Sequence, residues 1–146
     1  MTTTDTQQQL TQVFNDNFVA YYRSHVAHVN IMGRNFRSDH KLLAGVYKRR
    51  QAQIDVIAEL LRGLTVFMPH CLNDVTEGSH ITDQPIEGTA DELLELVRED
   101  LEHLKQCYEE LEHASSEEGH EEIANYAQEQ ILDLARSLWM LNSTLD

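Results

Sequence analysis

The stretch His28-Val-Asn-Ile-Met-Gly-Arg-Asn-Phe36, followed by His40 and then by Asp55 and Glu59, decides the fold and the chemistry expected of this chain. Two histidines flank a bend marked by a glycine, and two carboxylates sit four residues apart on the helix that should follow. Imidazole nitrogens together with carboxylate oxygens are ligands that suit iron, zinc and manganese. The stretch therefore predicts a metal site, provided that these side chains can meet.

Helix geometry decides how they can meet. Asp55 and Glu59 are about one turn apart and share one helix face. In a continuous helix, His40 lies roughly 22 Å from Asp55 along the axis but only about 60° around it. One chain therefore cannot bring these side chains to one ion. An antiparallel pairing of this helix with its two-fold mate would bring them together, and the interface would hold two identical sites.

Apolar residues recur at helical spacing in four segments, which predicts an all-α chain. The expected helices cover residues 6–32, 38–64, 89–113 and 117–143. Start signals precede three of them: Thr4 or Asp5, the capping box Thr89-Ala-Asp-Glu92, and a second such box at Ser115-Ser-Glu-Glu118. Gly33 is expected to end the first helix.

A long connection over residues 65–88 separates the second and third helices, and its Cys71–Val75 segment is a candidate short helix. A connection of this length suits a four-helix bundle in which the second and third helices run parallel. The sequence therefore predicts one bundle with a long crossover.

The motif His-x-Asn-x-x-Gly-x-Asn-Phe, with the second histidine and the carboxylate pair at these spacings, resembles the Dps family, the mini-ferritins named for DNA-binding protein from starved cells. The likeness covers nearly the whole chain. It implies a single ferritin-like domain over residues 1–146, a hollow dodecamer, and ferroxidase sites shared across two-fold interfaces. Fe(II) would be oxidised there by peroxide or dioxygen and stored as Fe(III) mineral, which protects against oxidative stress. The implied ligands are His28, His40, Asp55 and Glu59.

Three positions bear on how such a site would work. Val29 stands where Dps proteins commonly have a tryptophan, so electron or radical handling would differ. Ala44 stands four residues after His40, where many members have a carboxylate, which predicts a firm first metal position and a weaker second one. His25 lies one turn before His28 on the same face and is either an extra ligand or, slightly favoured, a polar residue near an interface.

The net charge of the chain indicates which partners it would attract or repel. The chain has 11 basic against 25 acidic side chains and a net charge of −14, a field that repels nucleic-acid phosphates and attracts cations. Some Dps proteins bind DNA through a lysine-rich tail, but residues 1–9 and 142–146 contain no Lys or Arg. The sequence therefore predicts no direct DNA binding. Two alternatives stay open: a nucleoid protein that protects DNA, and an assembly that holds zinc or manganese without turnover.

Other features receive structural interpretations. No apolar run is long enough to span a bilayer and no signal-peptide pattern opens the sequence, so a cytoplasmic protein with reduced thiols is expected. Cys71 and Cys107 are expected to be small apolar fillers, and Trp139 a core or interface aromatic. The basic run Lys48-Arg49-Arg50 is expected on a solvated or inter-subunit face.

Overall fold

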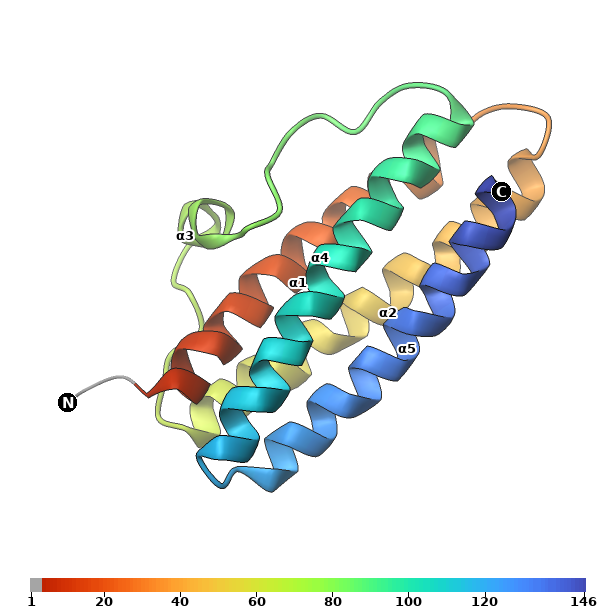
Figure 1. The fold of residues 1–146 in the computed structure, drawn as a ribbon. Coiled ribbons are helices and arrows are strands. Elements are labelled where there is room, and N and C mark those ends of the chain that lie inside the picture. Colours follow the sequence, from red (N-terminus) through yellow and green to blue (C-terminus); the bar gives the residue numbers. More distant parts are fainter. Residues whose placement is uncertain (1–3) are drawn as a thin grey trace.

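A computed structural model of the chain describes residues 4–146, and in this range the protein is helical apart from its connections (Figure 1). The all-α prediction is therefore confirmed. Residues 1–3, which belong to the N-terminal segment without Lys or Arg, lie outside the described residues. The described helices are α1 (Asp5–Asn30), α2 (Phe36–Gly63), α3 (Leu72–Gly78), α4 (Ala90–Glu117) and α5 (Glu121–Leu145).

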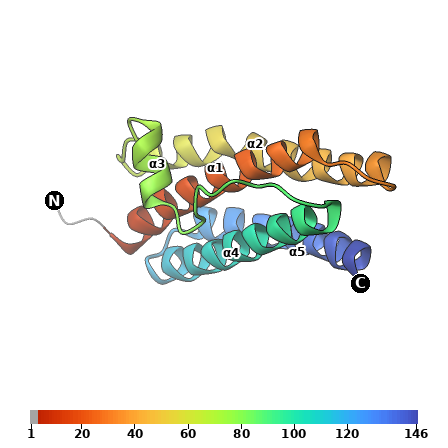
Figure 2. The same ribbon diagram turned by 90° about the horizontal axis from the view of Figure 1, so that it is seen from above.

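The four long helices form a bundle of two layers, with α1 and α2 in one and α4 and α5 in the other (Figure 2). Helix α1 packs against α2 and α4, and α4 packs against α5. After α2 the chain returns along the bundle before α4 begins, so α2 and α4 run parallel (Figure 1). The short helix α3 lies in this crossover and contacts α1. The predicted bundle with a long crossover and a short helix is confirmed.

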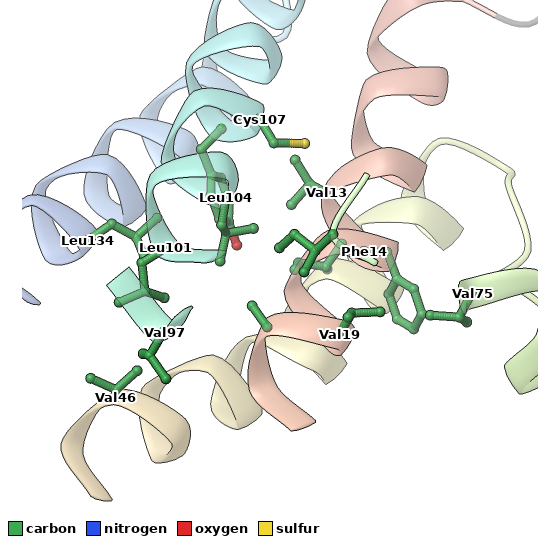
Figure 3. Packing of buried hydrophobic residues seen from close by; sticks show 14 of the residues in the cluster. Val13, Phe14, Val19, Val46, Val75, Val97, Leu101, Leu104, Cys107 and Leu134 are labelled. Atoms are coloured by element: carbon green, nitrogen blue, oxygen red, sulfur yellow. The ribbon is translucent and has the colours of Figure 1, made fainter. Parts of the chain in front are cut away.

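Apolar stripes from all four long helices meet in one core (Figure 3). Complete burial of a valine or leucine side chain contributes about 1.5–3 kcal/mol, so this core is the main favourable contribution to folding. Val75 reaches the cluster from α3 and thereby fixes the crossover against the bundle. Core side chains from the long helices include Val13, Phe14, Val19, Val46, Val97, Leu101, Leu104 and Leu134.

Two of the predicted helix starts have the expected caps. The Thr4 hydroxyl accepts from the Gln7 backbone N–H at 3.2 Å, and the Gln7 side chain accepts from the Thr4 N–H at 2.9 Å. Thr89 and Glu92 form the same reciprocal pair at the start of α4. Each box satisfies two N–H groups that have no partner inside the helix.

The third predicted cap is wrong. Ser115 lies inside α4, which continues to Glu117, and its hydroxyl donates to the Leu111 carbonyl at 2.7 Å. A serine in a helix can bond back one turn in this way, so its presence does not by itself start a helix. The reversal instead occurs at Gly119, whose φ of +81° favours glycine, and His120 precedes α5.

Burial corrects several single-residue expectations. Arg50 is only 2% exposed and pairs with Asp133 of α5 in the same subunit, so the expected solvated or inter-subunit face is wrong at this position. Trp139 is 66% exposed and therefore does not belong to the core of the subunit. Cys107 is a buried filler as predicted, whereas Cys71 is exposed. Both thiols are free, and none of the helices in the described range has the length and apolarity that crossing a membrane requires.

A carboxylate at the α4–α5 turn holds the start of α1. The Glu118 side chain accepts from the Thr6 hydroxyl and, at 2.7 Å, from the Thr6 backbone N–H. These bonds hold the pKa of Glu118 below its usual value of 4.5. A lowered pKa stabilises the fold above the unfolded-state pKa, and this stabilisation is lost as pH falls through the lower folded-state pKa.

We therefore expect Glu118→Ala to lower the melting temperature at pH 7, with a difference from the parent protein that shrinks once the pH falls below about 4.5. Thermal unfolding at a series of pH values measures this difference. The exposed neighbour Glu117 has no such partner among the described residues, and Glu117→Ala serves as the control. A Glu118 variant whose pH profile matches that of the control would contradict the anchoring role.

Candidate metal centre

The two predicted histidines meet across the bend between α1 and α2. His28 is in the last turn of α1 and His40 follows the start of α2, and the chain reverses between them through Gly33, whose φ is +131°. The imidazole rings stack with their centroids 3.8 Å apart and their planes 14° from parallel. The structure therefore brings this half of the predicted ligand set together.

A reciprocal pair of hydrogen bonds fixes both rings. The Nδ1 atom of His28 lies 2.8 Å from the His40 carbonyl oxygen, and the Nδ1 atom of His40 lies 2.7 Å from the His28 carbonyl oxygen. A carbonyl oxygen only accepts, so each Nδ1 must carry the proton that it donates. In the neutral rings each Nε2 then has a free lone pair, which is the form that binds a metal ion.

Burial favours this neutral form at His28. Partial burial lowers the pKa of His28, and the nearby His40, His25 and Lys48 lower it further, although the hydrogen bond to the His40 backbone opposes the shift. A lowered pKa keeps the imidazole uncharged at neutral pH and leaves Nε2 available without deprotonation.

The two carboxylates do not meet the histidines within one subunit. Asp55 and Glu59 are exposed on α2, and within residues 4–146 neither makes an ion pair or a side-chain hydrogen bond. Over the same range, no three His, Cys, Asp or Glu side chains are placed to hold a metal ion. Helix geometry predicts this result for a single chain, because the rise along α2 separates His40 from Asp55 and Glu59. The shared site remains a prediction, as does the alternative of an inter-subunit salt bridge at Asp55.

Exposed apolar side chains occur next to the histidine pair and in the bend that follows α1. Phe36 stacks on His40 with ring centroids 4.9 Å apart and is itself 40% exposed. Val29 and Met32 are 62% and 79% exposed at the end of α1. An apolar surface around a polar site is typical of a protein–protein interface, and it lies where the predicted two-fold mate would have to bind.

Sequence reasoning missed the aromatic surroundings of His25. Its ring stacks on that of Tyr47, with centroids 4.0 Å apart and planes 2° from parallel, and its Nδ1 lies 3.2 Å from the Tyr21 hydroxyl. Its centroid is 6.2 Å from that of His28. Tyr47 lies two turns after His40, and this spacing was the only available signal, since it places both side chains on the same side of α2.

Comparison with known proteins agrees with this architecture. A ferritin-like domain family matches residues 7–146. The chain is 27% identical over 134 residues to the DNA protection during starvation protein of Helicobacter pylori, covering 89% of this chain and 91% of that protein. It is 27% identical to antigen TpF1 of Treponema pallidum, whose crystal structure gives a TM-score of 0.90 over 97% of this chain and 91% of the antigen.

A third protein is similar to this chain in its fold. The Dps protein of Vibrio cholerae O1, a member of a broad superfamily of ferritin-like diiron-carboxylate proteins, is 20% identical with a TM-score of 0.91 over 97% of this chain and 89% of its own. The ferritin-like match covers almost the entire sequence, and the relatives include Dps proteins by sequence and by fold. The chain therefore belongs to the ferritin-like family, and its predicted membership of the Dps group is confirmed.

Proposed function

We propose that this chain is the subunit of a Dps-type mini-ferritin, a cytoplasmic dodecameric shell that oxidises Fe(II) with peroxide or dioxygen and stores Fe(III) as mineral. The observation that carries the proposal is the reciprocal hydrogen bonding of His28 and His40, which places a proton on each Nδ1 and leaves each Nε2 as the atom that can bind a metal ion. Such pre-oriented rings are what a histidine ligand set requires.

The second half of each site would come from a two-fold mate. Asp55 and Glu59 have no hydrogen-bond or ion-pair partner within residues 4–146 of their own subunit and are exposed on α2. The same helix has His40 near its other end. Antiparallel pairing of two α2 helices would place the carboxylates of one subunit at the histidines of the other. The exposed Val56, between the two carboxylates, would become buried at this interface.

The ligand chemistry suits iron oxidation. Neutral imidazoles bind Fe(II) without adding charge, and the carboxylates compensate the charge that increases when Fe(II) becomes Fe(III). Two Fe(II) ions supply the two electrons that convert one peroxide molecule into two hydroxide ions. The nearly parallel rings of His28 and His40 do not direct their lone pairs at one point. This arrangement supports one firmly held ion, with the second histidine binding a weaker ion or a bound water.

The charge of the assembly supports cation uptake. Each subunit carries −14, so twelve subunits would carry roughly −170 before counterions bind. A field of this sign concentrates Fe(II) at the shell. Ferric ions leaving the sites would then meet acidic side chains at which mineral can begin to form.

Aerobic addition of Fe(II) near neutral pH, followed by gel filtration with ferric absorbance recorded, tests the proposal. We expect oxidation faster than in buffer and iron that elutes with a large shell, because the site and the cavity belong to one assembly. Repeating the addition with peroxide in the absence of air identifies the oxidant. Oxidation at the buffer rate, with ferric precipitate and an iron-free protein peak, would contradict the proposal.

Experiments can distinguish iron storage from the two alternatives that the sequence left open, a metal-holding assembly without turnover and a DNA-binding protein. The same ligand types also fit zinc, and a protein that retains zinc through dialysis but does not oxidise Fe(II) would be a metal buffer. Direct DNA binding is disfavoured by the charge of −14. A gel shift at low salt, where electrostatic binding is strongest, is the sensitive measurement for it.

A further inference from the structure

A buried carboxylate with one unpartnered oxygen lies where α1 meets the crossover. Asp16 is 1% exposed. Its Oδ1 accepts hydrogen bonds from the Gln12 side chain at 3.0 Å, from the Ser79 hydroxyl at 3.0 Å and from the His80 backbone N–H at 2.7 Å. Its Oδ2 is also buried but has no hydrogen-bond partner within residues 4–146. Buried polar atoms nearly always have a partner, so this oxygen indicates a place for a water molecule or an ion.

The imidazole of His80 faces the unpartnered oxygen. Its Nδ1 lies 3.7 Å from Asp16 Oδ2, which is too far for a hydrogen bond. Two ligand atoms that lie about 2.0–2.2 Å from one tetrahedral zinc ion are separated by roughly 3.3–3.6 Å. The observed distance is therefore close to that of two atoms that share such an ion.

A thiol lies beside the same carboxylate. Burial raises the pKa of Cys107, and the negative charge of Asp16 raises it further, so the thiol keeps its proton at neutral pH when no cation is present. A cavity of about 320 Å³ separates α4 from the crossover at this level. Its lining side chains are His80, His103, Gln106, Cys107 and Glu110. The cavity therefore gives an ion a path from solvent to both the thiol and the imidazole.

We propose that Asp16, His80 and Cys107 bind a zinc ion that joins α1, the crossover and α4. One sulfur, one imidazole nitrogen and one carboxylate oxygen are a ligand set that suits zinc, and a water molecule or His103 completes the tetrahedron. On binding, the Cys107 thiol releases its proton to solvent and coordinates as the thiolate. The proposal does not depend on iron oxidation.

This site is separate from the candidate metal centre. Asp16 and His28 lie on the same helix, and the twelve residues between them correspond to roughly 18 Å along its axis. The candidate metal centre also contains no cysteine. A bound ion can therefore be assigned to one site or the other by whether a thiolate coordinates it.

Binding requires one side chain to move. As they stand, no three His, Cys, Asp or Glu side chains in residues 4–146 are placed to hold a metal ion. Asp16 and Cys107 are packed in long helices and are almost fully buried. The His80 side chain is 66% exposed and follows α3 in the crossover, so its ring is the group that can turn toward the other two. An ion held in this way stabilises only the folded state.

Cobalt(II) tests the ligand set, because it occupies zinc sites and gives a thiolate-to-cobalt charge-transfer absorption when a cysteine coordinates it. The test uses the assembled protein with Cys71→Ser, which leaves Cys107 as the only thiol. We expect the charge-transfer band to grow until one cobalt ion per subunit is bound by thiolate, and added zinc to abolish it. The band should weaken as the pH falls, because protons compete for the ligands.

His80→Ala, made in the same protein, should weaken cobalt binding at this site at least about tenfold. Zinc should raise the melting temperature of the Cys71→Ser protein by several degrees but leave that of the His80 variant unchanged. His70→Ala removes another exposed histidine of the crossover and is the matched control, which should keep both responses. Both substitutions are at exposed positions, so gel filtration should show the same assembly for all three proteins.

Two results would overturn the site. The first is cobalt binding without a charge-transfer band in the Cys71→Ser protein. The second is a band and a zinc-dependent melting temperature that His80→Ala leaves unchanged. Either result would mean that the unpartnered oxygen of Asp16 meets a water molecule only, and neither would affect the proposed iron oxidation at the other centre.

Discussion

Subunits with His28→Ala and subunits with Asp55→Ala should each oxidise Fe(II) at the buffer rate, yet they should recover activity when assembled together. Each variant alone removes one ligand from every site. In a mixed two-fold pair, the intact His28 of one subunit faces the intact Asp55 of the other, and one of the two shared sites is complete. Recovery follows from a site divided between chains and cannot occur if each chain holds its own complete site.

The size of the recovery is also predicted. With equal amounts of the two variants and random pairing, about one quarter of all sites receive both intact halves, so the rate should reach about one quarter of the parent rate. Co-expression of the two variants followed by stopped-flow Fe(II) oxidation measures it. Glu95→Ala, which removes an exposed carboxylate of α4, is the control and should oxidise at the parent rate. Mixed shells that stay at the buffer rate would overturn the shared site.

Asp100→Ala should destabilise the subunit by about 3–5 kcal/mol, because it leaves the buried guanidinium of Arg23 without its partner. The Arg23 Nε donates to the Asp100 carboxylate at 2.7 Å, and both side chains are 8% exposed. Arg23 also donates to the Gln84 carbonyl, so this one side chain joins α1, α4 and the crossover. Burial raises the pKa of Asp100 although Arg23 opposes the shift, so the desolvation of the carboxylate is only partly offset by its partner.

The free energy of unfolding in urea, at one fixed protein concentration, measures the effect. Glu109→Ala is the control, since it breaks the solvent-exposed pair between Lys105 and Glu109, whose atoms are 3.0 Å apart. An exposed pair of this kind contributes about 0.3–0.5 kcal/mol. Equal losses in the two variants would mean that the Arg23 pair stabilises no more than a surface contact does.

The sequence alone determined the elements and their order. The long helices, the caps at Thr4 and Thr89, and the crossover that makes α2 and α4 parallel were all predictable. Helix periodicity, capping and connection length are properties of neighbouring residues, so they can be read before the chain is folded. Helix geometry likewise showed that His40 and Asp55 cannot bind the same ion within one subunit.

Only the tertiary structure decided which side chains meet. Ser115 has the sequence of a cap but lies inside a helix, and Arg50 belongs to a basic run but is buried against Asp133. The stack of Tyr47 on His25 joins side chains from two helices. Such pairings depend on the rotation and spacing of packed helices, which no local pattern contains. The spacing of His28 and His40 in the sequence indicated two ligands. Only the fold showed that the two side chains bond reciprocally to each other's backbone carbonyl groups and so leave both Nε2 atoms free.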